Sequence, residues 1–133
     1  MKTANGFKIG VLLLLIAALT ACNSSSIRRN SRLEDSLLYY KIQMNRSNFI
    51  EAARFRAPGS NWDVRGLERY KLTDYQVQQS ITRDEGKTVE QTVMLRYIDR
   101  NTMRERSTLY KEIWNYDTGT GSWSLSGEPP VIR

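Results

Sequence analysis

The chain of 133 residues contains no histidine and one cysteine, Cys22. Without histidine it cannot form a Ser-His-Asp triad, a Cys-His nucleophilic pair or a zinc site with histidine ligands. With one cysteine it cannot close a disulfide within the chain, so the fold must be held together by its own core. We therefore expect a protein without a metal site, a cofactor or catalytic residues.

The residues before Cys22 have the pattern of a secretory signal peptide. Lys2 and Lys8 form a short basic leader, residues 9–19 are almost entirely apolar, and small residues follow. This order of basic, apolar and small residues is typical of an exported and cleaved segment. The apolar run is shorter than the roughly 20 residues that a membrane-spanning helix requires. The sequence thus predicts a signal peptide over residues 1–21.

The end of this segment, Leu19-Thr20-Ala21-Cys22, resembles the lipobox of bacterial lipoproteins. In that family the chain is cleaved between the residues equivalent to Ala21 and Cys22, the sulfur receives a diacylglyceryl group, and the new amino group is acylated, typically with palmitate. Several acyl chains anchor a protein stably, whereas one does so only marginally. Asn23 follows the cysteine, and the resemblance associates inner-membrane retention with aspartate there. It therefore implies lipidation at Cys22 and an outer-membrane location facing the periplasm. The alternative is an ordinary signal peptide that contains a cysteine.

The predicted mature chain is small and mildly basic. Removal of residues 1–21 leaves 112 residues, enough for one domain and a tether. It removes two lysines and no acidic residue, so the 20 basic and 14 acidic side chains become 18 and 14. Charges of both signs are interspersed, which is typical of a solvated surface. Export excludes nucleic acid as a partner, while attraction to an anionic envelope polymer is a weaker alternative.

The first half of the mature chain predicts a tether and a helical region. Residues 22–30 are polar and predict a flexible tether to the lipid, and residues 31–133 form the domain. Ser31-Arg32-Leu33-Glu34 has the form of a capping box, which predicts the start of a helix. The apolar stripe weakens near residues 45–48, where Ser47 is a candidate for a second N-cap. We expect one bent helix or two helices that meet near residues 45–47. The stripe consists of Leu33, Leu37, Tyr40, Ile42 and Met44, widened by Leu38, and continues through Phe49, Ala52, Ala53 and Phe55.

The second half of the chain has the alternating pattern of β-strands. After residues 60–68, where we expect a loop with a short strand, apolar residues recur at every second position from Leu72 onward. Turn residues separate four strands, and Pro129 and Pro130 end the last one. One face of the second strand is predicted to consist of Val89, Gln91, Val93, Leu95 and Tyr97, and the last strand carries Trp123 and Leu125. The sequence therefore predicts an α+β domain in which the N-terminal helix covers a four-stranded antiparallel meander.

This order of elements resembles the cystatin-like and NTF2-like folds, in which a helix lies in the concavity of a curved antiparallel sheet. Residues 37–40 and 48–53 resemble the paired N-terminal helices of NTF2-like domains, and residues 112–116 and 121–125 resemble their final hairpin. The stretch 60–68 scarcely has room for the further helix and longer sheet of a full NTF2-like domain. A simpler cystatin-like arrangement therefore fits better.

The resemblance also suggests where a site would lie. Some NTF2-like enzymes use a carboxylate and a tyrosine in the cavity between helix and sheet, and Glu112 alternates with Tyr110 and Trp114 along one strand. The other interpretation is that the aromatic residues pack the core while Glu112 lies at a strand edge or pairs with an arginine. We favour a non-enzymatic module that binds an envelope protein. The alternative is a small-ligand-binding or catalytic domain that uses this cavity.

Overall fold

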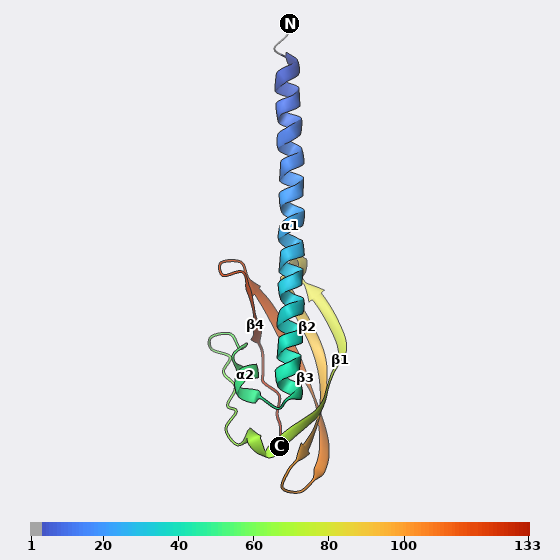
Figure 1. Cartoon of the computed structure of the whole chain (residues 1–133), viewed down its shortest axis with the longest axis vertical. Helices are drawn as coiled ribbons and strands as arrows, with labels where there is room; N and C mark the ends of the chain where they lie inside the picture. The colour runs from blue at the N-terminus through green and yellow to red at the C-terminus, as the bar shows by residue number, and fades with distance from the viewer. Residues whose placement is uncertain (1–3) are drawn as a thin grey trace.

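A long helix and an open four-stranded antiparallel sheet make up most of the structure (Figure 1). This computed structural model describes the backbone of residues 4–133 and the side chains of residues 24–133. Helix α1 (Ala4–Asn45) is followed by the short helix α2 (Phe49–Ala53) and, after a loop, by the strands. The strands are β1 (Tyr70–Arg83), β2 (Thr88–Asp99), β3 (Arg104–Asp117) and β4 (Ser122–Ser126), in that order across the sheet. The predicted α+β class and the antiparallel meander are confirmed.

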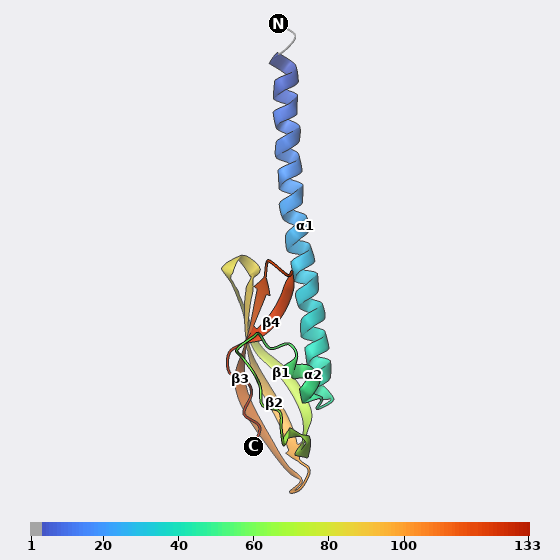
Figure 2. The same ribbon diagram turned by 90° about the vertical axis from the view of Figure 1, so that its left-hand side faces the viewer.

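Helix α1 packs along one face of the sheet with its C-terminal half, and its N-terminal half extends beyond the sheet (Figures 1 and 2). The described structure differs here from the flexible tether predicted over residues 22–30, because this segment is part of α1. The capping box at Ser31 is not used for the same reason: the helix continues through it. Residues Ala21 and Cys22 also belong to α1, but their side chains lie outside the described part of the chain. Cleavage and lipidation there stay predictions.

Two arginines attach this part of α1 to the sheet. Arg29 donates from Nη2 to the carbonyl oxygen of Glu85 at 2.9 Å, and Arg32 donates from Nη1 to that of Gly121 at 2.6 Å. The indole of Trp123 donates to the carbonyl oxygen of Arg29 at 3.1 Å. These bonds join α1 to the β1–β2 and β3–β4 turns and give the helix tertiary support where the sequence predicts a tether.

The turn glycines make this attachment sterically feasible. Gly86 and Gly121 have positive φ angles, 84° and 68°, which side-chain-bearing residues adopt at a cost. A Cβ atom at Gly86 would lie 2.8 Å from Nη2 of Arg29, and one at Gly121 would collide with Arg32. Both turns therefore favour glycine for the backbone conformation, and a side chain there would displace the end of the arginine.

The helical region consists of two helices, α1 and α2, which is one of the two predicted alternatives. Asn48, and not Ser47, is the N-cap of α2, and its side chain accepts from the amide of Glu51. Ser47 instead has a positive φ of 57°, and its hydroxyl accepts from the amide of Leu72 at 2.7 Å. The N-cap of the second helix is thus one residue later than predicted, because the hydroxyl of Ser47 is bonded to the backbone of β1 instead.

The inner face of the sheet is packed against α1 and α2. All five residues predicted for β2 are buried, and Trp123 and Leu125 of β4 are buried as well. On β3 the buried positions are Glu112 and Trp114, and Leu109 on the opposite face is 59 % exposed. The core residues from the helices are Tyr40, Met44, Phe49 and Ala52. One face of the sheet is therefore packed, as expected for an open antiparallel sheet, and the other is accessible to solvent.

The connection between α2 and β1 differs from the prediction. Residues 60–66 form a loop without the expected strand, and a 3-10 helix (Leu67–Arg69) follows it. Trp62 lies against Phe49 at the edge of the core, with ring centroids 5.6 Å apart. The segment 55–57 pairs with β4 instead: the amide of Leu125 donates to Phe55, and the amide of Ala57 donates to Leu125, both at 2.7 Å. This segment covers the outer edge of β4.

Candidate functional site

The candidate site is a buried carboxylate surrounded by aromatic side chains. Glu112 lies in β3, on the face of the sheet that packs against α1, and its side chain is 0 % exposed. Its Oε2 accepts from the hydroxyl of Tyr75 at 2.7 Å and from the indole of Trp114 at 3.2 Å. Its Oε1 accepts from the hydroxyl of Tyr110, which lies 3.3 Å from that of Tyr40. We call these five residues the Glu112 cluster.

The Glu112 cluster brings together three elements of the fold. Tyr40 comes from α1, Tyr75 from β1, and the other members from β3. Residues Tyr110, Glu112 and Trp114 share a face because side chains alternate along a strand. Sequence reasoning predicted these three together. It placed Tyr40 in the apolar stripe of the helix, but it did not predict that the hydroxyl of Tyr75 reaches Glu112 or that the hydroxyl of Tyr40 reaches that of Tyr110.

Burial is the main influence on the protonation of this cluster. It raises the pKa of the Glu112 carboxyl above its ordinary value, although the three hydrogen-bond donors and the positive charge of Arg56 act in the opposite direction. Burial is also the largest cause of the raised pKa values of Tyr40, Tyr75 and Tyr110, which keep these phenols protonated. The phenols are therefore donors, and a buried carboxylate with several donors has its hydrogen-bonding capacity met.

The guanidinium of Arg56 lies near the cluster without bonding to Glu112. Its Nη1 donates to the carbonyl oxygen of Gly127 at 2.8 Å and to the hydroxyl of Ser60 at 3.3 Å. Its Nε and Nη2 atoms are buried without a hydrogen-bond partner among the described residues. The predicted pairing of Glu112 with an arginine is thus wrong, because two tyrosines and a tryptophan donate to its carboxylate instead. Glu112 lies just before the part of β3 that pairs with β4, so the backbone of this residue is at the strand edge while its side chain is buried.

The geometry excludes direct access of a substrate to Glu112 in this conformation. Trp114 is 0 % exposed, and its ring centroid lies 5.5 Å from that of Tyr40 and 5.8 Å from that of Phe55. A general base must reach the proton that it abstracts, directly or through one water molecule. Here the space between helix and sheet is filled by these rings. In this conformation the cluster is a buried hydrogen-bonded network within the core.

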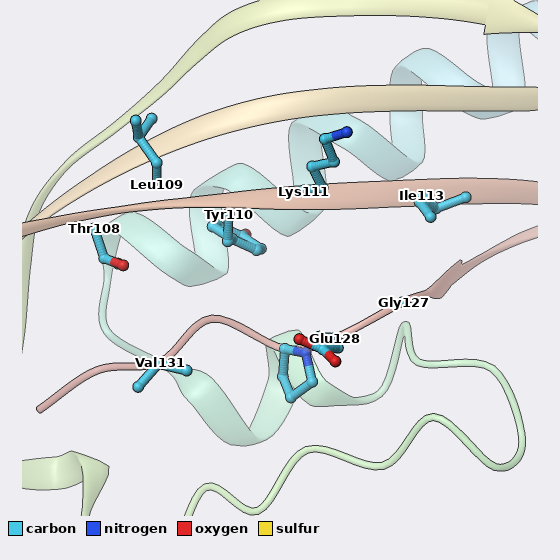
Figure 3. A pocket seen from close by; sticks show the side chains of 9 residues that line it. Thr108, Leu109, Tyr110, Lys111, Ile113, Gly127, Glu128 and Val131 are labelled. Carbon is cyan, nitrogen blue, oxygen red and sulfur yellow. The ribbon is translucent and has the colours of Figure 1, made fainter.

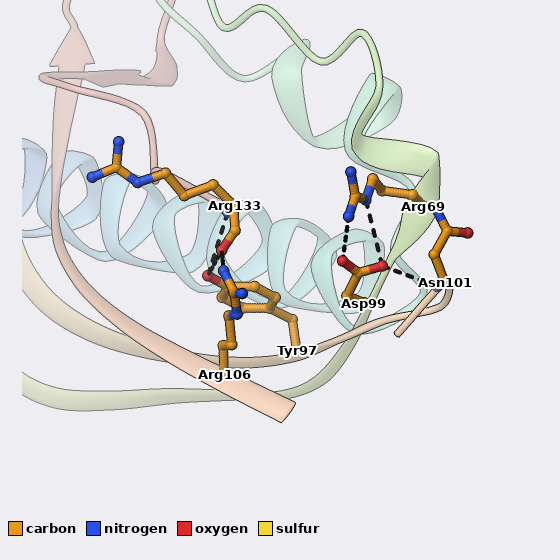
Figure 4. Close-up of polar contacts among 6 residues, drawn as sticks. All are labelled: Arg69, Tyr97, Asp99, Asn101, Arg106 and Arg133. Atoms are coloured by element: carbon orange, nitrogen blue, oxygen red, sulfur yellow. Dashed lines mark hydrogen bonds and ion pairs between the residues drawn. The ribbon is translucent and has the colours of Figure 1, made fainter. Parts of the chain in front are cut away.

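The two turn aspartates stabilise their own turns, and Asp99 also forms an ion pair with Arg69 (Figure 4). Asp117 Oδ1 accepts from the amides of Gly119 at 2.7 Å and Thr120 at 3.3 Å, and Asp99 Oδ1 accepts from the amide of Asn101 at 2.9 Å. Such bonds to the backbone two or three residues on are how aspartate stabilises a turn. Among the residues with described side chains, no group of three or more potential metal ligands comes together. In the same part of the chain no helix is long and apolar enough to cross a membrane.

No protein-family model, curated protein sequence or solved structure matches this chain. Its function therefore has to be inferred from its own sequence and geometry.

The free energy of unfolding is expected to decrease as the pH rises above about 4.5, the ordinary pKa of a glutamate carboxyl. Because the pKa of Glu112 is higher in the folded than in the unfolded state, its protonated form favours folding. That contribution is complete below the unfolded-state pKa and is lost as the pH rises through the folded-state pKa. Glu112→Gln should flatten the profile, and Glu34→Gln on the exposed surface should leave it unchanged. Urea unfolding from pH 4.5 to 8 measures this, and equal slopes in both variants would contradict the assignment.

Proposed function

We propose that this chain is a lipoprotein of the bacterial envelope that acts as a non-enzymatic protein-interaction module. In this proposal the signal peptide is removed before Cys22, the acylated cysteine anchors the protein in the outer membrane, and the domain faces the periplasm. The observation that carries the non-enzymatic part is the filled space between helix and sheet. Of the three predicted cavity residues, Glu112 and Trp114 are 0 % exposed, while Tyr110 is partly buried and lines a hollow of about 370 Å³ beside β3.

The attachment of α1 to the sheet supports a fixed position of the domain above the membrane. Arg29 lies seven positions after Cys22, and at 1.5 Å per residue seven helical steps span about 10 Å. The bonds of Arg29 and Arg32 begin at that point and hold the β1–β2 and β3–β4 turns. In the proposed arrangement these turns face the lipid, and the β2–β3 turn at the opposite end of the sheet faces the periplasm.

A cystatin-like build is the finer fold assignment that we propose. Support comes from the α1–α2 region packed on one face of an open antiparallel meander. The 3-10 helix (Leu67–Arg69) is the helical element between α2 and β1 among the described residues, which fits a cystatin-like arrangement better than a full NTF2-like one.

A ligand-binding or catalytic NTF2-like domain is the second candidate, and one observation favours it. A carboxyl with a raised pKa next to tyrosine donors is the chemistry that a general acid or base requires. A small-molecule site, however, is a pocket of about 300 Å³ or more with converging polar groups. Because aromatic rings fill this space, catalysis would require α1 to move away from the sheet.

The position after the cysteine gives a direct test of the proposed location. In a Gram-negative host with enteric-type sorting, the protein is expected in the outer-membrane fraction, and Asn23→Asp is expected to move it to the inner-membrane fraction. Separation of the membranes by density, followed by immunoblotting, measures the distribution. Ser25→Asp, which adds the same charge two residues later, serves as the control. Recovery of the parent protein and the Asn23→Asp variant in the same membrane would contradict the sorting assignment.

A further inference from the structure

One edge of β3 is unpaired over residues 104–112, the part of the strand that follows the β2–β3 turn. β4 pairs only with residues 113–117 of β3, so the backbone of residues 104–112 has a strand partner on the β2 side alone. The register between β2 and β3 is regular from Thr88 to Asp99 without a bulge. A regular free edge offers a row of backbone donors and acceptors to which another strand can be added.

The other edges of the sheet are less suited to strand addition. The pairing of β1 with β2 is irregular between Leu72 and Asp74 and again between Val77 and Gln79. Bulges of this kind twist an edge away from a regular ladder. The outer edge of β4 is bonded to the segment 55–57. The unpaired part of β3 is therefore the edge that is both regular and uncovered by a strand.

The C-terminal segment borders this edge without pairing with it. Ile132 is buried, and the carbonyl oxygen of Arg133 accepts from Arg106 Nη1 at 2.7 Å and from the hydroxyl of Tyr97 at 3.1 Å (Figure 4). Among the described residues, no backbone hydrogen bond joins residues 127–133 to β3. Proline nitrogens at positions 129 and 130 cannot donate such bonds.

A groove runs between β3 and this segment (Figure 3). Two hollows of about 370 and 490 Å³ lie between β3 and this segment, and a third of about 360 Å³ extends the groove over β2 and β3. The first and second share Thr108 and Val131, and the second and third share Arg106 and Ser107, so the hollows are continuous along the strand. Their combined length follows β3 from Glu105 to Ile113.

The groove changes character along its length. One end has most of the apolar side chains, with Leu109 59 % exposed and Val131 57 % exposed beside Ile113. Lys111 and Glu128, which carry opposite charges, also line this end. The other end carries three exposed arginines, Arg96, Arg106 and Arg133, against the one carboxylate of Glu105 that lines it. An apolar half and a basic half are complementary to an extended segment that has apolar side chains at one end and carboxylates at the other.

We infer that the free edge of β3 binds an acidic, extended segment of a partner protein as a fifth strand. The apolar side chains of that segment lie over Leu109 and Val131, and its carboxylates lie at Arg106 and Arg133. The C-terminal segment runs antiparallel to β3, with Gly127 near Ile113 and Arg133 near Arg106. A partner strand that also runs antiparallel to β3 therefore has its apolar residues at its N-terminal end and its acidic residues at its C-terminal end.

This inference rests on the proposed function in that the partner is an envelope protein. Residues 104–109 adjoin the β2–β3 turn, at the end of the sheet opposite the β1–β2 turn to which Arg29 is bonded. In the proposed orientation the groove is thus on the half of the domain farther from the lipid, where a periplasmic segment reaches it.

A synthetic peptide tests the inference with the full-length chain in detergent micelles. The probe has eight residues: five that alternate valine and threonine, and three glutamates at the C-terminal end, with a fluorophore at the N-terminus. Fluorescence anisotropy measures its dissociation constant. Binding is expected to weaken at least about tenfold in Arg106→Glu, because an attractive charge becomes repulsive, and to stay within about twofold in Lys71→Glu on β1.

Two further measurements keep the inference falsifiable if Arg106→Glu loosens the C-terminal segment. Methylation of alternate backbone nitrogens of the peptide should abolish binding to the parent protein, since it removes ladder donors and leaves the side chains. Hydrogen exchange should slow at the amides of residues 105–112 when the peptide is bound. Equal binding of the methylated peptide, protection along β1 or no binding would overturn the inference. Protection of residues 105–112 that rises with protein concentration alone would replace the partner by a second copy of this chain.

Peptide binding at β3 and lipid anchoring at Cys22 can be tested independently of each other. The mass of the same preparation reports acylation at Cys22, and peptide binding at β3 does not depend on it. Loss of peptide binding in a correctly acylated protein therefore overturns the docking site, while an unacylated protein that binds the peptide overturns the anchor.

Discussion

Replacement of Cys22 by alanine is expected to abolish acylation and to remove the protein from the outer-membrane fraction. The cysteine sulfur is the atom that receives the diacylglyceryl group in the bacterial lipoproteins whose lipobox this segment resembles, and alanine has no nucleophile to replace it. Each buried methylene of an acyl chain contributes about 0.8 kcal/mol to membrane binding, so loss of every chain removes the whole anchor. Fractionation of cells followed by immunoblotting measures the effect.

A matched substitution in the same segment distinguishes loss of the anchor from a general defect in export. Ser26→Ala lies four residues after Cys22 and leaves the lipobox intact, so it should fractionate with the parent protein. Outer-membrane recovery of Cys22→Ala at the level of the parent would mean that the cysteine is not the anchor. The proposed module would then have no attachment in the residues that motivated it.

Truncation of Trp114 is expected to have the largest effect on stability. The side chain is 0 % exposed, packs edge-on against Tyr40 and Phe55, and donates a hydrogen bond to Glu112. Removal of a buried tryptophan side chain costs about 3–5 kcal/mol because of lost contacts and the cavity that remains. This is a large fraction of the roughly 5–15 kcal/mol that stabilises a typical domain. Urea unfolding at 25 °C, followed by circular dichroism, measures the difference between Trp114→Ala and the parent.

Trp62 provides the control for this substitution. It is only partly buried and contacts Phe49 at the edge of the core. Trp62→Ala should therefore cost less than half of what Trp114→Ala costs. If the two variants were equally stable, the aromatic packing between α1 and the sheet would not be the centre of the core, and the case for a filled concavity would fail.

Much of the sheet was predictable because its signal is local. The alternation of Val89, Val93, Leu95 and Tyr97 with polar residues follows from the period of a strand, and the structure buries all four. Asp117 was likewise predictable as a turn residue from its place between two strands. Each of these predictions depends only on residues close together in the chain.

The predictions that were wrong depended on contacts between distant residues. The segment 22–30 was predicted to be a tether because its serines and asparagines do not favour a helix. It is helical in the structure, where the hydrogen bond from Arg29 to Glu85 joins residues 56 positions apart. Ser31 has the sequence context of an N-cap, but a helix that is already supported on both sides of it has no need of one. Ser47 and Asn48 are both good caps, and the bond from Leu72 to Ser47 decides between them.

Three of the five members of the candidate site were predictable, but their role was not. Strand alternation places Tyr110, Glu112 and Trp114 on one face, and that was predicted. The complete burial of Glu112 was not predicted, because a glutamate in a strand ordinarily lies at an edge or on the surface. Its burial depends on the hydroxyl of Tyr75, 37 positions away, and on the pair of Tyr40 and Tyr110. The periodicity of one segment does not report such a convergence.

Mass spectrometry of the intact protein purified from membranes tests the central proposal most directly. A lipoprotein anchored at Cys22 should give a mature chain that begins at this residue and carries the mass of a diacylglyceryl group and an amide-linked acyl chain. Cys22→Ala should lack that added mass. A parent chain that is cleaved at another position, or that begins at Cys22 without added acyl mass, would contradict the proposal of a membrane-anchored module.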